Sequence, residues 1–441
     1  MTALRQATSD TFRSLRIRNV RLFFGGQLIS QVGNWLTLIA QTLLVLRLTD
    51  SGVAVGVLTA AQFGPMLVFG AFAGLVADRS DKRRLLLGVQ SFAMLQSFVL
   101  AALAFMDRPP LMAIYAVALV GGFAVALDNP TRRSFIVEMV PEDHVNNAVS
   151  LNSALMTGSR VLGPALAGLL VTTVGFGWCF LLDGLSYLAV LAGLWRMDPT
   201  QLRRAPGALR ARGQVRAGLR YARSVPELWV PLVMMAVIGT LAFNFQTVLP
   251  LFATRDLGGT EVTFTTLMSF LSLGSLIGAL ATARRERVSV HTVGLSAVAF
   301  GLSMALLSVA PTSGAALAVG VLVGIASIAF MTASTAIVQT RADPSMRGRV
   351  LALQAIVFLG STPIGGPIVG AVAERFGARY SLALGALATI AAGIVGLLAV
   401  RREERAAAGV VFDGVAVEAP PTSVEDSEPS LLDPTITPRA S

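Results

Sequence analysis

Cysteine, lysine and histidine are almost absent from this sequence, and each scarcity excludes a class of protein. Cys179 is the only cysteine, so one chain can build neither a disulfide framework nor a cysteine metal site. Lys82 is the only lysine and follows Asp81, so the Gly-Lys-Ser/Thr element of an ATP-binding loop is missing. The only histidines are His144, in a predicted loop, and His291, at a predicted membrane edge. We therefore expect no metal site, no cofactor and no enzymatic nucleophile with its base.

Charged residues are also scarce, at 14% of 441 residues, whereas 54% of the residues are apolar. Such a balance is rare in a water-soluble chain of this length. Apolar stretches of about 20 residues, long enough to cross the ~30 Å hydrocarbon core as helices, recur along almost the whole sequence. We predict an all-α membrane protein with twelve transmembrane helices. These lie near residues 20–46, 53–76, 85–106, 110–130, 147–173, 178–196, 228–252, 262–283, 289–310, 314–338, 348–373 and 378–400.

The net charge of +10 comes from basic residues that sort by predicted membrane side. If the N-terminus is cytoplasmic, 29 of the 35 Lys and Arg residues fall in inner loops and tails. Arg160 lies within a span, and the residues at outer ends are Arg47, Arg108, Arg255, Arg375 and Arg379. This asymmetry follows the positive-inside rule and predicts a multi-pass protein of the bacterial inner membrane with both termini in the cytoplasm. It argues against a nucleic-acid partner.

The second half of the sequence repeats the first at an offset of 203 residues. Pro141 falls on Pro344 at this offset. Without a gap, Gly163-Pro164 then aligns with Gly366-Pro367. We expect two six-helix halves in a pseudo-twofold arrangement, residues 20–196 and 228–400. Repeated halves of this kind suit alternating-access transport, with the substrate site between them at mid-depth.

Three segments lie outside the predicted halves. Residues 1–19 form a basic N-terminal tail, residues 197–227 a linker rich in Arg, Pro and Gly, and residues 401–441 a tail in which we expect disorder. The linker interleaves apolar and basic side chains, namely Val215, Leu219 and Tyr221 with Arg212, Arg216, Arg220 and Arg223. This pattern fits either a short amphipathic helix on the anionic inner leaflet or a solvated basic loop.

The connection between the second and third predicted spans has the sequence GLVADRSDKRR. It resembles the signature of the major facilitator superfamily, and the matching residues are Gly74, Asp78, Arg79, Asp81, Lys82, Arg83 and Arg84. The resemblance implies a cytoplasmic gate whose charges pair in one conformation and become hydrated in the other. Anchoring of topology is the alternative, but topology alone requires no acids among the basic residues. The second half keeps Gly278 but has Thr282 and Ala283 in place of Asp-Arg, so we expect a one-sided gate.

The same resemblance implies partners for the gate charges. Asp78 would face the start of the eleventh span, near residues 347–350, where the helix dipole favours a carboxylate. Arg79 would bind an acid near the inner end of the fourth span, for which Glu138 and Asp128 are the candidates.

Residues 128–153 are similar to the branch of this superfamily that includes siderophore and macrolide exporters. Gly163 and Pro164 partly match a motif of its antiporters. Glycine permits close approach of helices and proline removes a backbone hydrogen bond. We therefore expect helix kinks here and at the equivalent Gly366 and Pro367.

Taken together, these resemblances imply a secondary transporter and not an enzyme. It would export a small molecule, such as a drug, a siderophore or another natural product, by alternating access with proton antiport. The expected partners are this substrate, a coupling proton and membrane lipids, with the chain acting as a monomer. An importer or uniporter of the same fold is the alternative, and a scaffold or receptor that transports nothing is a more distant one.

Polar residues inside the predicted spans are costly in hydrocarbon and mark functional positions. Two helical stripes contain them: Gln27, Gln31, Asn34 and Gln41 in the first span, and Thr240, Asn244 and Thr247 in the seventh. We expect both stripes to line the central cavity, with hydrogen bonding between helices as the alternative. Many relatives in the resembled family have an aspartate where this chain has Asn34, and asparagine can carry no proton.

Two charged residues lie inside predicted spans. Arg160 is near the middle of the fifth span, the costliest depth for a charge, and Asp183 is nearer the outer end of the sixth. A snorkelling guanidinium could close most of this difference in depth, so we expect an ion pair in which Asp183 titrates. A purely structural ion pair is the alternative.

Overall fold

The computed structural model describes residues 12–203, 214–282 and 289–413. These residues are mostly helical and contain no β-strand. Among them, twelve helices are long and apolar enough to cross a membrane, which confirms the all-α membrane fold expected from the sequence. The chain divides into two compact units, residues 1–400 and 401–441. The expectations for the N-terminal tail before residue 12, for Arg212, for Ala283 and for the tail after residue 413 lie outside the described residues.

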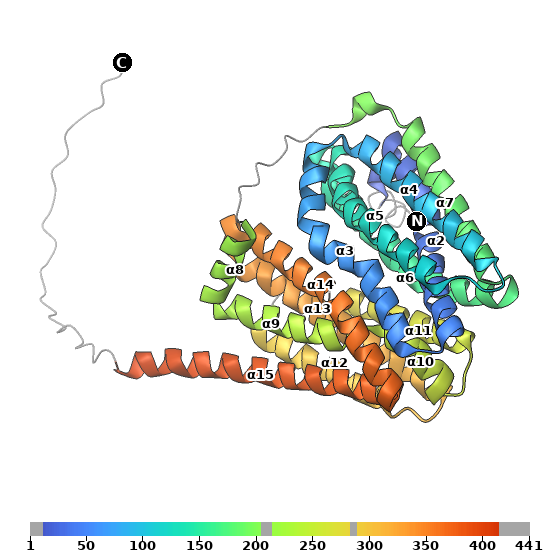
Figure 1. Ribbon diagram of the computed structural model, residues 1–441. Coiled ribbons are helices and arrows are strands. Elements are labelled where there is room, and N and C mark those ends of the chain that lie inside the picture. Colours follow the sequence, from blue (N-terminus) through green and yellow to red (C-terminus); the bar gives the residue numbers. More distant parts are fainter. Residues whose placement is uncertain (1–11, 204–213, 283–288, 414–441) are drawn as a thin grey trace, which may run out of the picture. The chain divides into compact units, whose positions relative to one another are not determined.

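Within the described residues, the first half consists of six long helices (Figure 1). They are α2 (Arg18–Thr49), α3 (Gly52–Arg79), α4 (Lys82–Ala104), α5 (Leu111–Glu138), α6 (Val145–Thr173) and α7 (Phe176–Arg196). Short 3-10 turns, η1 (Arg13–Arg16) and η2 (Glu142–His144), precede α2 and α6. Helix α7 packs mainly against α2 and α4, while α5 packs against α3 and α4. The six helices therefore form one bundle.

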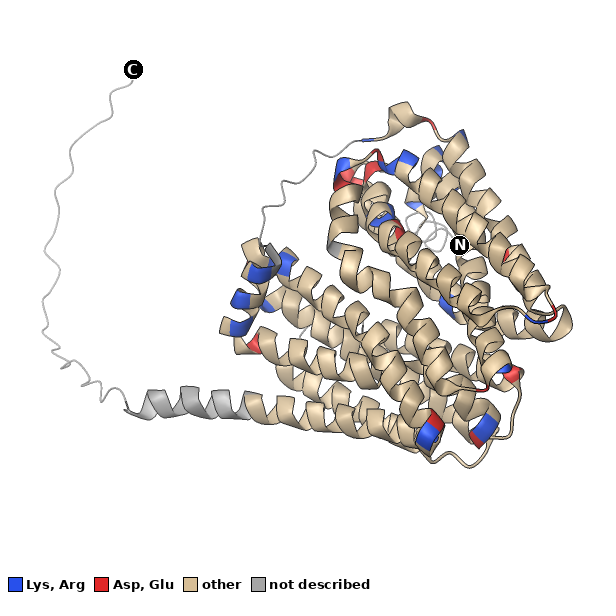
Figure 2. Cartoon of the chain, in the orientation of Figure 1, with Lys and Arg blue, Asp and Glu red and all other residues tan. Residues whose placement is uncertain are grey.

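The second half repeats this plan with one span divided into three pieces. Its elements are α9 (Pro226–Leu241), α10 (Phe245–Leu251), the π-helical turn η4 (Phe252–Asp256), α11 (Glu261–Thr282), α12 (Val290–Ser308), α13 (Ser313–Arg341), α14 (Pro344–Phe376) and α15 (Ala378–Asp413). Helix α13 packs against α11 and α12, and α14 packs against α9. In Figure 2 the charged residues of the second half gather near the ends of its helices, whereas some of those of the first half also lie along its helices.

Two pairs of helices join the halves, α3 with α14 and α6 with α11. The sequence repeat exchanges these pairs, because it places α3 on α11 and α6 on α14. Two equivalent interfaces are what a pseudo-twofold arrangement of the halves requires. The turns into α7 and α15 agree with the repeat, since Gly175 and Gly377 both have a positive φ, of 90° and 102°. Glycine adopts this backbone conformation without steric cost.

Small residues allow α3 and α14 to approach closely. A Cβ atom on Gly52 would lie 2.6 Å from the carbonyl oxygen of Gly370, and one on Gly56 would lie 2.6 Å from that of Gly366. Any larger side chain at these positions would therefore separate the halves.

Prolines lie within the helices where kinks are expected. Helix α6 continues through Pro164, and α14 continues through Pro367. At Gly163 a Cβ atom would lie 2.3 Å from the Cβ of Trp35, so this glycine lets α6 pack on α2. Gly366 has the corresponding role in α14, against α3. The prolines and glycines at both places thus lie at contacts between helices.

The seventh span is broken, although the sequence analysis predicts it as continuous over residues 228–252. Helix α9 ends at Leu241 and α10 begins at Phe245. The side-chain amide of Asn244, at the start of α10, donates to the carbonyl oxygen of Thr240 at 2.7 Å. Asparagine side chains compete in this way with backbone groups for helix carbonyls, which explains the interruption.

The linker contains the turn η3 (Pro199–Gln201) and helix α8 (Gln214–Ser224), so the chain adopts the helical alternative here. Helix α8 packs against α14, with Gly218 facing Arg349. The Tyr221 hydroxyl accepts a hydrogen bond from the Asp343 backbone amide at 3.0 Å. Arg216, Arg220 and Arg223 are exposed, and Figure 2 shows basic residues gathered on this helix.

Candidate functional site

The charged motif at residues 74–84 spans the end of α3 and the start of α4. Asp81 caps α4, because its side chain accepts a hydrogen bond from a backbone amide in the first turn at 3.0 Å. The Arg83 guanidinium donates to the carbonyl oxygens of Leu194 and Trp195 at 2.7 and 3.1 Å. A cation at this end of α7 is favoured by the helix dipole. These contacts attach the motif to its own half.

Both acids predicted to bind Arg79 have other partners. The Lys82 ammonium lies 2.6 Å from the carboxylate of Glu138, and both side chains are largely buried. Asp128 forms an ion pair with Arg132, one turn further along α5. Neither acid bonds to Arg79 in the described part of the chain. Glu138 therefore contacts the motif through Lys82, the first residue of α4, and not through Arg79.

The end of the bundle that holds the α2–α3 connection, which we call the α2–α3 end, is bridged by polar contacts between the halves. They are Arg47 with Glu261 at 2.6 Å, Asp50 with Arg255 at 3.0 Å, and Glu374 with the Ser51 hydroxyl and the Val53 amide at 2.5 and 2.9 Å. The Glu374 carboxylate thus binds the first turn of α3 from across the interface, where the helix dipole favours a negative charge.

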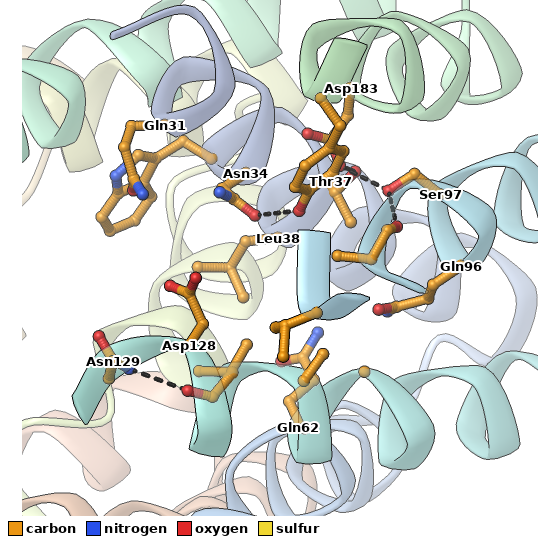
Figure 3. Close-up of a pocket in the computed structure, with 18 of the residues that line it drawn as sticks. Gln31, Asn34, Thr37, Leu38, Gln62, Gln96, Ser97, Asp128, Asn129 and Asp183 are labelled. Atoms are coloured by element: carbon orange, nitrogen blue, oxygen red, sulfur yellow. Dashed lines mark hydrogen bonds between the residues drawn. The ribbon is translucent and has the colours of Figure 1, made fainter. Parts of the chain in front are cut away.

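A cavity of about 380 Å³ lies inside the first half. Its lining comes from α2 to α7, and Figure 3 shows polar residues facing it from several of these helices. The volume is within the ~300–1,000 Å³ range of small-molecule sites. The charged residues of the lining are Asp128, Arg132, Arg160 and Asp183.

Asp183 on α7 is 1% exposed, and the two oxygens of its carboxyl group have different surroundings. Its Oδ2 accepts hydrogen bonds from the hydroxyls of Thr37 on α2 and Ser97 on α4, at 2.6 and 2.7 Å (Figure 3). Its Oδ1 has no hydrogen-bond partner among the described residues. A Cβ atom on Gly33 would lie 2.4 Å from Oδ1, so only glycine leaves room for this carboxyl group. A buried carboxylate with one unsatisfied oxygen is costly, and a proton on that oxygen removes the charge.

Asp128 and Arg132 lie on α5 and compensate each other's charge. Asp128 also accepts a hydrogen bond from the side-chain amide of Gln90 at 2.7 Å. A guanidinium nitrogen of Arg132 lies 3.8 Å from the sulfur of Met156 on α6. No group of three or more His, Cys, Asp or Glu residues that could hold a metal ion occurs in the parts of the chain described here.

Arg160 lies one helical turn after Met156 and lines the same cavity. It is half-buried, its Nε atom is buried without a partner, and its side chain makes no hydrogen bond or ion pair with any described residue. The predicted ion pair between Arg160 and Asp183 is therefore wrong for this conformation. The prediction compared depths in the membrane, but α7 packs mainly on α2 and α4, so Asp183 points to hydroxyls on those helices.

The polar stripe of the first span lies largely on the cavity. Gln31, Asn34 and Gln41 line it, whereas Gln27 is buried outside it and accepts a hydrogen bond from the Gln31 amide at 3.2 Å. The Asn34 side-chain oxygen accepts a hydrogen bond from the Tyr187 hydroxyl at 2.7 Å.

The polar stripe of the seventh span lies elsewhere, since none of its residues lines this cavity. The hydroxyl of Thr240 donates to the carbonyl oxygen of Ala236 at 2.7 Å, and Asn244 bonds within its own span. The hydroxyl of Thr247 lies 3.0 Å from that of Thr59 in the other half. These groups satisfy helices and join the halves, which is the alternative role considered for the stripe.

The comparisons with known proteins agree with this architecture. A family model of the major facilitator superfamily, described as "Transmembrane secretion effector", matches residues 9–418. The chain belongs to this superfamily. The Staphyloferrin A transporter of Staphylococcus aureus is 24% identical over 377 residues, covering 84% of this chain and 93% of that protein. Macrolide efflux protein A of Streptococcus pyogenes is 22% identical over 391 residues, covering 84% and 93%.

A solved structure shows the same fold. It is a bacterial homologue of the human lysosomal transporter Spinster in an inward-facing and occupied conformation, with a TM-score of 0.69 at 16% identity. The match covers 88% of this chain and 97% of the other. The resemblance to the superfamily and to its branch of exporters is thus confirmed. This major facilitator chain is a multi-pass membrane transporter, and its family is not one of enzymes.

Several cavity residues of the transporter were not singled out from its sequence. The fourth span predicted over residues 110–130 ends before Arg132, because the apolar run ends there, but α5 continues to Glu138. Thr37 and Ser97 are moderately polar residues in long spans and gave no signal by themselves. Gln90 is a buried amide inside a predicted span, and a search for polar residues in every span would have found it.

Proposed function

We propose that this transporter exports a small molecule by alternating access and exchanges it for protons carried by Asp183. The observation that supports this most directly is the state of the Asp183 carboxyl group, which lines the cavity with one oxygen bound by two hydroxyls and the other without a donor. Ionisable residues in spanning helices often belong to proton relays. Export is favoured by the relatives, since one of them is named a macrolide efflux protein.

Alternating access needs two gates, and the two ends of the bundle supply candidates for them. At the α2–α3 end, the contacts of Glu374 with Ser51 and Val53 hold the halves together and would break when that end opens. At the other end, residues 74–84 would form the second gate, with the Lys82–Glu138 ion pair fixing the position of its loop. Charges suit both places, because water compensates them after separation.

We place the end that carries residues 74–84 in the cytoplasm of a bacterial inner membrane. The basic residues concentrate on this side, as the positive-inside rule requires. Both termini and the linker would then be cytoplasmic, and the exposed Arg216, Arg220 and Arg223 of α8 would contact anionic lipid headgroups. The complete set of two halves in one chain supports a monomeric transporter.

Accumulation assays test this function. A bacterial host that lacks its own efflux pumps would express the wild type or Asp183→Asn, and the cellular content of a panel of antibacterial compounds and iron chelators would be measured. We expect lower accumulation of at least one compound with the wild type, and no such difference with Asp183→Asn. Purified protein in liposomes would then be given a pH gradient to establish proton exchange.

The outcomes separate the possible directions and couplings. Higher accumulation with the wild type would indicate an importer of the same fold. Export that is unchanged by Asp183→Asn, or that ignores the pH gradient in liposomes, would remove Asp183 or the proton from the mechanism.

A further inference from the structure

We infer that the substrate carries a negatively charged group and that Arg160 binds it inside the first half. This inference rests on the proposed function, because it takes the cavity as the substrate site. It adds the charge of the substrate and the residue that selects it.

The charge balance of the cavity lining leaves Arg160 without a counterion. Asp128 and Arg132 form an ion pair with each other, and Gln90 also donates to Asp128. Asp183 is held by hydroxyls on other helices and does not reach Arg160. The lining contains no further acid. One positive charge therefore remains on the wall formed by α5 and α6.

An uncompensated guanidinium is expensive at this position. Arg160 is half-buried in a spanning helix, its Nε atom is buried, and no described residue accepts a hydrogen bond from it. Charged side chains inside spanning helices usually pair with another group or mark a substrate path. Since the protein offers no acceptor in this conformation, a bound anion would satisfy the group.

The surroundings of Arg160 favour an anion over a cation. Met156 lies one turn before Arg160 and contacts the guanidinium of Arg132, so two guanidinium groups approach the same part of the cavity wall. Only one of them has a carboxylate partner. A guanidinium presents a planar set of donors that matches a carboxylate, sulfonate or phosphate group. A cationic ligand would be repelled there.

The rest of the cavity suits an apolar body with few polar groups. Trp35, Leu38, Phe63 and Val89 contribute apolar surface, while Gln31 and other amides provide hydrogen-bonding groups. A volume of about 380 Å³ limits the bound portion to a molecule of a few rings. The ligand class is thus an amphipathic organic anion.

A matched pair of fluorescent probes tests the inference. Anilinonaphthalene sulfonate is an amphipathic anion, and phenylnaphthylamine is the same ring system without the sulfonate. Purified full-length protein in nanodiscs of zwitterionic lipid would be titrated with each probe, and binding to empty nanodiscs subtracted. We expect the wild type to bind the sulfonate more tightly than the neutral probe.

Three variants locate the selecting charge. Arg160→Gln should weaken binding of the sulfonate at least about tenfold, the effect of losing a hydrogen bond to a charged group, and leave the neutral probe unchanged. Arg160→Lys should restore part of the preference, because it keeps the charge. The control Arg196→Gln removes an exposed arginine at the end of α7 and should change neither titration.

The results distinguish this inference from the proposed function. Equal affinity of the wild type for the two probes would overturn the inference, and this measurement needs no variant to fold. A parallel loss of both probes in Arg160→Gln would indicate a structural role for Arg160 and would also contradict it. Charge-selective binding that depends on Arg160, combined with a negative export screen, would support the anion site and reject the exporter.

Discussion

The two halves of this transporter share one fold but differ in the charges that they place inside the membrane. At the offset of the repeat, Arg160 corresponds to Pro363 and Asp183 corresponds to Ala386. The second half has its acids and arginines near the ends of its spans, for example Glu374 in the last turn of α14. The cavity and its charged lining therefore belong to the first half.

Aromatic side chains occupy part of the interior of the second half. The ring centroid of Phe243 lies 5.1 Å from that of Phe300 and 5.2 Å from that of Phe358. Tilted and edge-to-face pairs of this kind stabilise a packed interior and carry no proton and no ionic ligand. The difference teaches that a sequence repeat preserves the contacts between helices while the chemistry of each interior diverges. The proposed function and the proposed anion site place substrate and proton binding in the first half. The second half would then provide the packed surface against which the first half moves.

Asp183→Asn should have the largest effect on transport, and it tests whether proton binding belongs to the first half. One coupled charge at about 100 mV supports roughly fiftyfold accumulation, and the variant should lose this gradient-driven component of export entirely. Export of an identified substrate from liposomes with an imposed membrane potential and pH gradient would measure it. Ser97→Ala keeps the carboxyl group and removes one donor, so it should slow coupled transport about tenfold without abolishing it. Coupled transport by Asp183→Asn at the wild-type rate would end the assignment of proton chemistry to the first half.

Thr37→Val and Thr240→Val compare equivalent positions of the two halves directly. Thr37 donates to Asp183, whereas Thr240 donates to a carbonyl oxygen of its own helix. Loss of a hydrogen bond to a charged group is worth about 1.5 kcal/mol, so Thr37→Val should slow coupled export roughly tenfold. Thr240→Val should leave export near the wild-type rate. Equal rates for the two variants would show that the halves contribute alike.

The sequence was sufficient for the features that depend on composition along the chain. Apolar runs predicted the spans, and the intramembrane position of Asp183 marked it as a candidate for a functional role, because hydrocarbon penalises charge wherever it occurs. The partners of Asp183 could not be predicted, since hydropathy reports depth along a helix and not the neighbours that its faces meet. For the same reason, hydropathy does not reveal that Thr247 bonds to Thr59 across the interface. Arg132 could not be predicted as a cavity residue. Its ion pair with Asp128, one turn earlier, lets α5 extend beyond its apolar run.

Glu374→Gln should have a moderate effect, at the α2–α3 end. The exposed carboxylate bonds to Ser51 and Val53 across the interface, and such contacts are worth about 0.5–1 kcal/mol, so opening of this end should increase roughly threefold. Thr59→Cys in a Cys179→Ala background provides a buried reporter at the interface, and its rate of reaction with a maleimide measures opening.

Glu142→Gln is the matched control for Glu374→Gln. Glu142 is an exposed acid of the first half whose carboxylate makes no hydrogen bond or ion pair with the described residues, so loss of its charge should leave the reporter rate unchanged. An identical reporter rate in Glu374→Gln and the wild type would show that the glycine contacts of α3 and α14 hold this end closed without the carboxylate.

The smallest effect concerns Asp343, which caps α14 in the second half, and Asp198, which caps the turn η3 in the linker after the first half. Here the comparison predicts similarity, because caps outside the membrane obey the same rules beside both halves. The hydroxyl and amide of Ser345 donate to Asp343 at 2.6 and 2.8 Å and hold its pKa below the ordinary value of about 3.9; Thr200 acts in the same way on Asp198.

A folded-state pKa below the unfolded value means that each group contributes stability above pH ~4, and that the contribution is lost as the pH falls through the folded pKa. Asp343→Asn and Asp198→Asn should therefore each lower the Tm slightly at neutral pH and converge with the wild type in strong acid, which thermal unfolding in detergent at several pH values would measure. A pH-independent difference for one variant alone would show that its cap acts through geometry rather than charge, and that the linker after the first half and the start of α14 are stabilised differently.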